Sequence, residues 1–147
     1  MPFTDRELLA RLIQCEAGGE GDDGMRGVAS VVMNRVKVPY GEYFRVNQGD
    51  LRKVIEQAGQ FDCLRDVVGG QPNLQTIYNM NPTDLHYEIA DWAIGGGGLG
   101  AIANSLWYFN PFNPECPGVF PYNGSGVVQN RVNNHCFYIP TQKYAGT

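Results

Sequence analysis

An apolar stripe at helical spacing opens the chain, and its members are Leu8, Leu9, Leu12 and Ile13. Residues three and four apart lie on one face of an α-helix, so this spacing predicts an amphipathic helix. Thr4 and Glu7 form a capping-box pattern just before the stripe, and Gly18 follows it. The pattern therefore predicts a helix from Asp5 to about Ala17.

A carboxylate continues this stripe, because Glu16 stands four residues beyond Leu12 and three beyond Ile13. A carboxyl group on a buried face loses water, and this loss disfavours the ionised form and raises the pKa. A raised pKa suits a general acid that works near neutral pH. The alternative is that the helix frays at Gly18 and Gly19, which would leave Glu16 in solvent.

Three further segments have helical patterns. The apolar run from Met25 to Val36 predicts a buried central helix that Pro39 ends, preceded by a polar loop whose aspartates can cap it. A short helix is predicted from Asp50 to Ala58. Asn81 as N-cap and Pro82 at the first helical position predict another, ended by glycines at 95 to 98 and 100. Residues 63–80 are expected to form a loop with one helical turn.

The pattern changes in the last third of the chain. Residues 105–109 and 135–139 are runs rich in aromatic residues that predict strands, and each is followed closely by a proline. Residues 127–132 fit a third strand. Helices followed by strands predict an α+β fold with a small antiparallel sheet near the C-terminus. The glycine-rich stretch at 95–100 lacks the lysine of a phosphate loop. We expect it to be a flexible connection or a close backbone approach to a ligand.

Size and charge limit the classes of function. The chain has 147 residues, 43% of them hydrophobic, which suits one domain spanning 1–147. Its net charge is −4 and its eleven basic residues form no run, so a nucleic-acid partner is not expected. No apolar stretch has the length of a membrane helix, and the first residues carry no export signal. We therefore expect no membrane partner.

The four cysteines, Cys15, Cys63, Cys116 and Cys136, have no CxxC spacing, so neither a zinc ribbon nor a thioredoxin-like motif is indicated. We expect free thiols, as in a chain made in a reducing compartment. A disulfide between Cys116 and Cys136 is the alternative. Two histidines far apart in sequence do not make a metal site, and we expect no metal.

Several side chains could carry chemistry. Glu16 and Glu20 are four apart and would share a helix face only if the first helix reached Glu20. Glycoside hydrolysis normally uses two carboxylates, whereas cleavage by an internal sugar nucleophile needs one acid. His135 could reach a cleft from the end of its strand or be structural. His86 is expected on the surface without a role.

Several short motifs together resemble one known family. They are the segment Glu16 to Gly21 (EAGGEG), the run Val31 to Val36 (VVMNRV), Gly59 to Phe61, Ser105 to Pro111 (SLWYFNP), Cys116 with Pro117, and His135 to Pro140. In order and spacing they resemble the spore cortex-lytic cell-wall hydrolases of the SleB and CwlJ type. The cysteine-containing pieces are more similar to the CwlJ branch.

This resemblance implies a lysozyme-like, lytic-transglycosylase-related fold that cleaves peptidoglycan glycan strands of the spore cortex, which contain muramic δ-lactam. It places the proposed catalytic acid at Glu16 and the second motif glutamate at Glu20. From the matched segments we expect Gln60, Tyr108, Asn110, His135 and Tyr138 to bind substrate.

The resemblance also implies a biological setting. It implies synthesis in the mother cell without a signal peptide, location at the boundary of spore coat and cortex, a coat protein partner, and a role in germination. No cofactor is expected, but the resemblance links calcium dipicolinate to activation.

Two other functions stay open at the level of sequence. One is a peptidoglycan amidase or peptidase in which Cys136 or Cys15 acts with His135. Side chains at 135 and 136 point to opposite faces of a strand, which counts against that pair. The other is a non-catalytic coat protein that binds cortex glycan.

Overall fold

The computed structural model describes residues 3–147. The helices are α1 (Asp5–Ala17), α2 (Gly21–Lys37), α3 (Gly41–Asn47), α4 (Leu51–Glu56), α5 (Asp84–Ile94) and α6 (Gln142–Ala145). The strands are β1 (Val67–Val68), β2 (Gln71–Pro72), β3 (Trp107–Phe109), β4 (Gly126–Val132) and β5 (His135–Pro140). Short 3-10 helices are η1 (Asp62–Leu64), η2 (Ile77–Asn79) and η3 (Gly100–Ile102).

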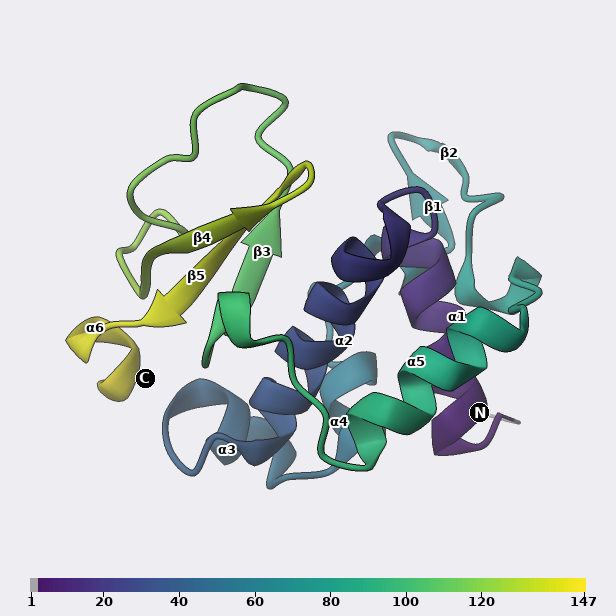
Figure 1. Cartoon of the computed structure of the whole chain (residues 1–147), viewed down its shortest axis with the longest axis horizontal. Coiled ribbons are helices and arrows are strands. Elements are labelled where there is room, and N and C mark those ends of the chain that lie inside the picture. Colours follow the sequence, from purple (N-terminus) through teal and green to yellow (C-terminus); the bar gives the residue numbers. More distant parts are fainter. Residues whose placement is uncertain (1–2) are drawn as a thin grey trace.

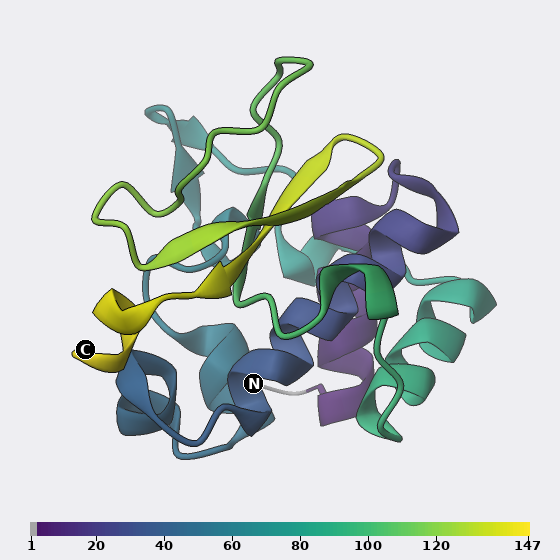
Figure 2. The ribbon, with the colours of Figure 1, turned by 60° about the vertical axis from the view of Figure 1, so that its left-hand side comes forward.

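Helix α2 lies at the centre of the molecule, with α1 and α5 on one side of it and the sheet of β3, β4 and β5 on the other (Figures 1 and 2). The sheet is antiparallel with the strand order β3-β5-β4. In its register Trp107 pairs with Tyr138 and Tyr108 pairs with Phe137. Helices before a small antiparallel sheet are the α+β arrangement that the pattern predicted.

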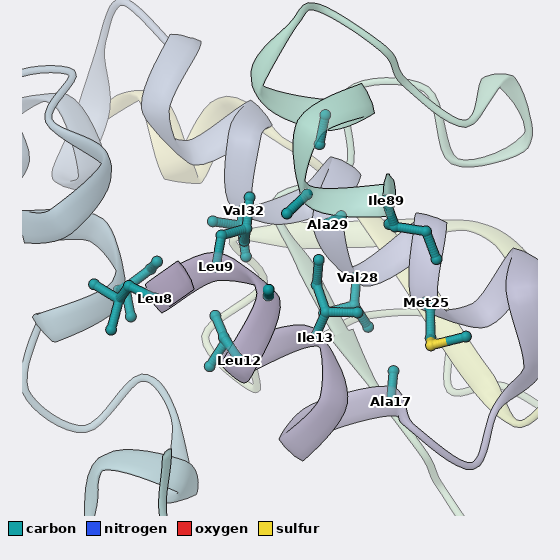
Figure 3. Close-up of a cluster of buried hydrophobic side chains, with 14 of the residues drawn as sticks. Leu8, Leu9, Leu12, Ile13, Ala17, Met25, Val28, Ala29, Val32 and Ile89 are labelled. Atoms are coloured by element: carbon teal, nitrogen blue, oxygen red, sulfur yellow. The ribbon is translucent and has the colours of Figure 1, made fainter. Parts of the chain in front are cut away.

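The main core forms where α1, α2 and α5 meet. The side chains of Leu9, Ile13, Val28 and Ile89 are completely buried there (Figure 3). The predicted stripe of α1 is therefore its buried face. Burying a side chain of this size contributes about 1.5–3 kcal/mol each, so this contact fixes how α1 lies on α2.

The sheet packs on α2 at a glycine. A Cβ at Gly27 would stand 2.7 Å from Cζ of Phe137, so only glycine lets β5 approach α2 this closely. The two faces of the sheet alternate as expected, because Trp107 and Phe109 belong to one apolar cluster while Tyr108 packs with Phe137 on the face toward the helices.

Helices α1 and α4 begin at or next to their predicted starts, whereas the N-cap of α5 is not the predicted residue. The Thr4 hydroxyl accepts from the Glu7 amide at 3.2 Å at the start of α1, and the Asp50 carboxylate caps α4. The prediction for α5 is wrong by two residues, because Thr83 is its N-cap. The Thr83 amide donates to Nδ1 of His86 at 2.9 Å, so His86 is a buried capping residue.

Other departures come from loops. The aspartates before α2 do not cap it, because α2 already begins at Gly21. Helices α3 and α6 were not predicted, and residues 63–80 contain the β1–β2 hairpin as well as helical turns. The backbone at Gly97 approaches the Trp92 indole, where a Cβ would lie 2.3 Å from Nε1. The glycine-rich stretch thus packs against a side chain of its own chain.

Candidate active site

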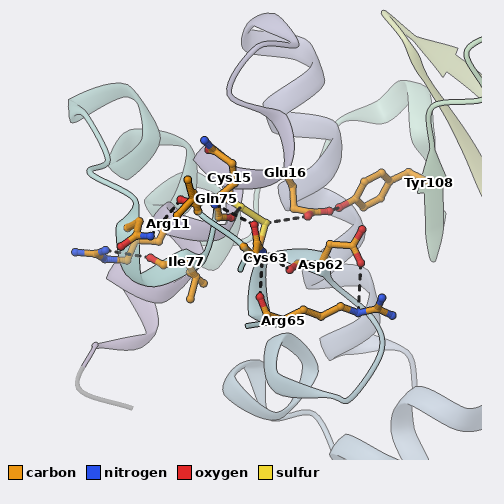
Figure 4. The surroundings of a disulfide bond; sticks show 12 residues. Arg11, Cys15, Glu16, Asp62, Cys63, Arg65, Gln75, Ile77 and Tyr108 are labelled. Carbon is orange, nitrogen blue, oxygen red and sulfur yellow. Dashed lines mark hydrogen bonds and ion pairs between the residues drawn. A yellow bond between two sulfur atoms is a disulfide. The ribbon is translucent and has the colours of Figure 1, made fainter. Parts of the chain in front are cut away.

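Glu16 lies in the last turn of α1, half-buried, with its carboxyl group directed toward the sheet. The Tyr108 hydroxyl, on β3, donates to Oε1 of Glu16 at 2.5 Å. The other oxygen, Oε2, lies 3.0 Å from Sγ of Cys63 (Figure 4). Helix α1 does not fray here, and both carboxyl oxygens contact residues that are far away in sequence.

Burial raises the pKa of Glu16, and the nearby Asp62 carboxylate raises it further. The Tyr108 hydrogen bond and the Arg35 guanidinium act in the opposite direction and do not cancel the effect on this pKa. Burial, together with the charge of Glu16, also holds the pKa of Tyr108 well above its usual value. A carboxyl group in such surroundings can hold a proton and release it to a substrate oxygen.

The expectation of free thiols is wrong, because Cys15 is joined to Cys63 and Cys116 to Cys136, which leaves no free cysteine in residues 3–147. The first disulfide forms one wall around Glu16. Its sulfurs carry no hydrogen, so the 3.0 Å approach of Cys63 Sγ to Glu16 is a close contact and not a hydrogen bond. Sequence spacing did not reveal this pairing, since Cys15 and Cys63 are 48 positions apart.

The disulfides overturn the Cys–His alternative. A cysteine nucleophile reacts as a thiolate. Both Cys15 and Cys136 are bonded to another sulfur, so neither can form the thiolate. His135 and Cys136 also face opposite sides of β5, as alternation predicted, with Cys136 packed among Trp107 and Tyr138.

Glu20 connects two parts of the backbone. Its carboxylate accepts from the Asn134 amide at 3.2 Å and from Nδ2 of Asn134 at 3.1 Å, and its carbonyl accepts from Nδ2 of Asn133. Because α1 ends at Ala17, Glu16 and Glu20 do not share a helix face. Glu20 thereby joins the α1–α2 connection to the β4–β5 turn.

His135 lies between Glu20 and Tyr108. Its Nδ1 is 3.5 Å from Oε1 of Glu20, too far for a good hydrogen bond, and its ring meets the Tyr108 ring edge-on at 5.2 Å. Burial lowers the pKa of His135, and the Glu20 carboxylate only partly opposes this. A neutral imidazole therefore supports the ring of the tyrosine that bonds Glu16.

A pocket of about 310 Å³ opens beside this group, between α2 and α3 on one side and the sheet with α6 on the other. Its lining includes Arg35, Glu42, Tyr43, Gly59, Gln60, Trp107, Tyr108, Phe120 and Tyr144. Tyr108 thus contributes to the pocket wall and to the Glu16 hydrogen bond. Glu16 itself is not one of the lining residues, so Tyr108 is the link between the pocket and the acid.

The structure brings some of the predicted binding residues together and separates others. Gln60 and Tyr108 line the pocket, and His135 packs behind Tyr108. Asn110 accepts from the Phe112 amide at 2.8 Å and caps its own loop. Tyr138 is fully buried and donates to the Pro117 carbonyl at 2.7 Å, so it does not reach the pocket surface.

Arg35 is a site residue that sequence reasoning missed. It is 5% exposed and lines the pocket, although it belongs to the apolar run of α2. Arg35 is a charged residue between apolar Val32 and Val36, and it interrupts an apolar pattern as Glu16 does in α1.

Residues 3–147 contain no group of three or more His, Cys, Asp or Glu side chains that could hold a metal ion. Among the helices in that range, none has the length and apolar character needed to cross a bilayer.

Comparison with known proteins places this geometry in context. A family model described as cell wall hydrolase matches residues 19–138 and begins just after Glu16. The cell wall hydrolase CwlJ of Bacillus subtilis (strain 168) is 31% identical over 138 residues, which cover 94% of this chain and 87% of that protein. CwlJ of Oceanobacillus iheyensis is 30% identical over 135 residues, covering 92% and 86%.

Two solved structures have the same fold. The catalytic domain of the Bacillus cereus SleB protein superposes with a TM-score of 0.66 at 24% identity, covering 92% of this chain and 89% of that chain. The catalytic domain of the germination-specific lytic transglycosylase SleB from Bacillus anthracis gives 0.64 at 22% identity, covering 94% and 98%. This similarity confirms the predicted lysozyme-like α+β fold.

Proposed function

Because the chain belongs to the cell wall hydrolase family, of the CwlJ and SleB type, we propose that it cleaves peptidoglycan glycan strands with Glu16 as general acid. The observation that carries this proposal is a desolvated carboxyl group of raised pKa whose hydrogen-bond partner, Tyr108, lines a pocket. Desolvation favours the protonated form of Glu16, which is the form that can donate to a glycosidic oxygen.

The chemistry needs only one carboxylic acid. Glu16 donates its proton to the glycosidic oxygen, the bond from that oxygen to the sugar C1 breaks, and the leaving sugar takes the proton as a hydroxyl. Water or a hydroxyl of the same sugar then attacks C1 and returns a proton to Glu16. The Tyr108 hydroxyl at 2.5 Å stabilises the carboxylate that exists between these steps.

The surroundings of the other carboxylates support this assignment. Glu20 is held by Asn134 and serves the backbone connection. Asp62 lies on η1 with its side chain 71% exposed and pairs with Arg65 at 3.4 Å. The Glu20 carboxylate is already engaged by Asn134 and the Asp62 carboxylate is exposed to solvent, so we assign both a supporting role.

We further propose that the substrate is spore cortex carrying muramic δ-lactam and that the protein acts in germination at the coat–cortex boundary. The names of its relatives, cell wall hydrolase CwlJ and germination-specific lytic transglycosylase SleB, support this. A coat protein as partner and calcium dipicolinate as activating signal belong to the same proposal. Two disulfides support a working place outside a reducing compartment.

Fragment analysis of cortex digested by the Glu16→Gln variant tests the acid. This variant keeps the shape of the side chain and the Tyr108 hydrogen bond but removes the proton. We expect cleavage to fall by at least about 100-fold, the usual contribution of a general acid. In the wild-type digest, mass analysis of the ends distinguishes hydrolysis, which leaves reducing ends, from transglycosylation, which leaves anhydro ends.

Cleavage by Glu16→Gln at the wild-type rate would remove Glu16 from the mechanism. Binding of the wild-type protein to cortex without release of fragments, with and without calcium dipicolinate, would instead favour the non-catalytic cortex-binding function.

A further inference from the structure

The pocket beside Glu16 contains a buried positive charge without a carboxylate partner. Arg35 donates from Nε to the Leu106 carbonyl at 2.8 Å and from Nη1 to Oε1 of Gln60 at 3.3 Å. Within residues 3–147 no Asp or Glu oxygen lies within 4.0 Å of its guanidinium. Burying a cation is costly unless an anion is nearby, so a bound anion would be favoured here.

Two aromatic rings hold the guanidinium in place. Its Cζ lies 4.6 Å from the centre of the Tyr43 ring and 5.3 Å from that of Phe61. These contacts and the bond to the Leu106 carbonyl fix the plane of the group. Nη2 of Arg35 has no hydrogen-bond partner among the described residues. The buried polar atoms without a partner in that range are Nη1 of Arg52 and Nδ1 of His135, so Nη2 of Arg35 is not buried in this sense. It therefore keeps some contact with solvent, and Arg35 is a lining residue of the pocket.

Gln60 offers a second donor. Its Oε1 accepts from Arg35 and, at 2.9 Å, from the Tyr43 hydroxyl. A guanidinium can only donate, so this pair of bonds sets the orientation of the Gln60 amide and leaves Nε2 without a partner in the described chain. Arg35 and Gln60 together thus present N–H groups to the pocket.

Glu42 is the other charged side chain in the pocket lining. Its Oε2 accepts from Nε2 of Gln57 at 3.0 Å, and no ion pair joins it to Arg35. No carboxylate of the pocket lining therefore forms an ion pair with the guanidinium, which acts on the Glu16 carboxyl group without an ion pair between them. A planar group with N–H donors on one side matches a carboxylate.

We propose that Arg35 and Gln60 form a subsite for a carboxylate carried by the muramoyl residue of the glycan strand. The inference rests on the proposed function, because the pocket adjoins Glu16 through Tyr108. The carboxylate comes from one of two sources: the lactyl group of unsubstituted muramic acid, or the end of a short peptide attached to it. N-acetylglucosamine carries neither group.

Binding to the wild-type protein tests the subsite without any cleavage. The probes are N-acetylmuramic acid, its methyl ester, N-acetylmuramoyl-L-alanine and N-acetylglucosamine, followed by fluorescence of Trp107 in the pocket wall. We expect at least one of the two acids to bind about tenfold or more tightly than the ester and N-acetylglucosamine, as a charge-assisted hydrogen bond provides. The acid that binds more tightly identifies the source.

Two variants assign the effect to residues. Gln60→Leu and Arg35→Lys should each reduce the preference for the acid over its ester, with folding verified by circular dichroism. Arg26→Lys is the matched control, because Arg26 also lies on α2 but pairs with Asp22 at 2.6 Å. Its preference should equal that of wild type.

Equal binding of both acids, the ester and N-acetylglucosamine to the wild-type protein would overturn the subsite. That result would leave the proposed function standing if Glu16→Gln still abolished cleavage of cortex. Unchanged cleavage by Glu16→Gln would contradict the proposed function even if the acid were preferred.

Discussion

The most informative residue is Glu16, whose environment is unfavourable for its own charge. Desolvation raises its pKa, while the Tyr108 hydroxyl and the Arg35 guanidinium limit that rise. The group therefore combines a buried acid with a nearby donor that stabilises its conjugate base. Such a residue serves chemistry at the expense of folding stability.

The Glu16→Gln variant should be more stable than wild type at pH 7. Above the pKa of about 4.3 for an unperturbed glutamate, the unfolded wild-type chain releases a proton that the folded chain retains. Wild-type stability therefore falls as pH rises toward the folded pKa, whereas glutamine does not titrate. We expect a gain of about 0.5–2 kcal/mol at pH 7 that shrinks toward pH 4, measured by urea unfolding at both pH values. A gain that grew toward pH 4 would contradict the raised pKa.

Tyr108→Phe should move the pH profile of cleavage. Removing the hydroxyl removes a bond that lowers the pKa of Glu16, so the alkaline limb of kcat/KM should shift to higher pH. The rate at the optimum should fall about tenfold, because the carboxylate loses a charge-assisted bond. Tyr138→Phe loses a hydroxyl bonded to Pro117 and serves as control. An equal shift in both variants would argue against the Tyr108–Glu16 bond as its cause.

At the scale of elements, the contact between α2 and β5 determines how the sheet lies against the helices. Gly27 permits it, since Phe137 occupies the space that a side chain would need. The same contact carries Tyr108, which pairs with Phe137 on the neighbouring strand, toward Glu16. A change in this packing would therefore alter the site as well as the fold.

Gly27→Ala should destabilise the protein although alanine is the better helix former. The propensity gain is about 1 kcal/mol, but overpacking against the Phe137 ring costs about 1–3 kcal/mol. Gly19→Ala is the control, since a Cβ at Gly19 meets nothing within 4 Å. Thermal unfolding of both variants measures the difference. A stabilised Gly27→Ala would mean that the sheet can move away from α2 without cost.

At the scale of the molecule, two disulfides secure the long loops. Cys15–Cys63 joins α1 to η1, next to Glu16, and Cys116–Cys136 ties the loop between β3 and β4 to β5. The first spans 48 positions and the second spans 20. One bridge therefore belongs to the surroundings of the acid, while the other holds a loop on the far face of the sheet.

Replacing both Cys15 and Cys63 by serine should cost about 4 kcal/mol of stability, and replacing Cys116 and Cys136 about 3 kcal/mol, from loop-closure entropy. The first double variant should also lose more cleavage activity, because it removes a wall of the Glu16 site. Urea unfolding and cortex clearance at a temperature where both variants are folded measure these effects. Equal losses of activity would contradict a special role for the first bridge.

Local interactions explain which features were predictable. The stripe of α1, its Thr4 cap and the alternation in β3 depend on neighbours within a few residues, so the sequence pattern contains them. The start of α5 was missed because both Asn81 and Thr83 are residue types that can cap a helix. The bond from the Thr83 amide to the His86 side chain, which favours Thr83, is not visible in the pattern. Helix α6 has only four residues, about one turn, so it is too short for periodicity to identify. Helix α3 buries only Tyr43 and Asn47 and therefore has no apolar stripe.

The sequence by itself determined that helices precede a small antiparallel sheet, and it singled out the carboxylate of Glu16 on the apolar stripe of α1. Only the tertiary structure decided that Tyr108, 92 positions away, donates a hydrogen bond to this carboxylate. It also decided that Arg35 and Gln60 line the same pocket as Tyr108. It also decided the pairing of the cysteines. The reason is physical: periodicity records which face of an element avoids water, whereas the partners on that face depend on how separate elements pack.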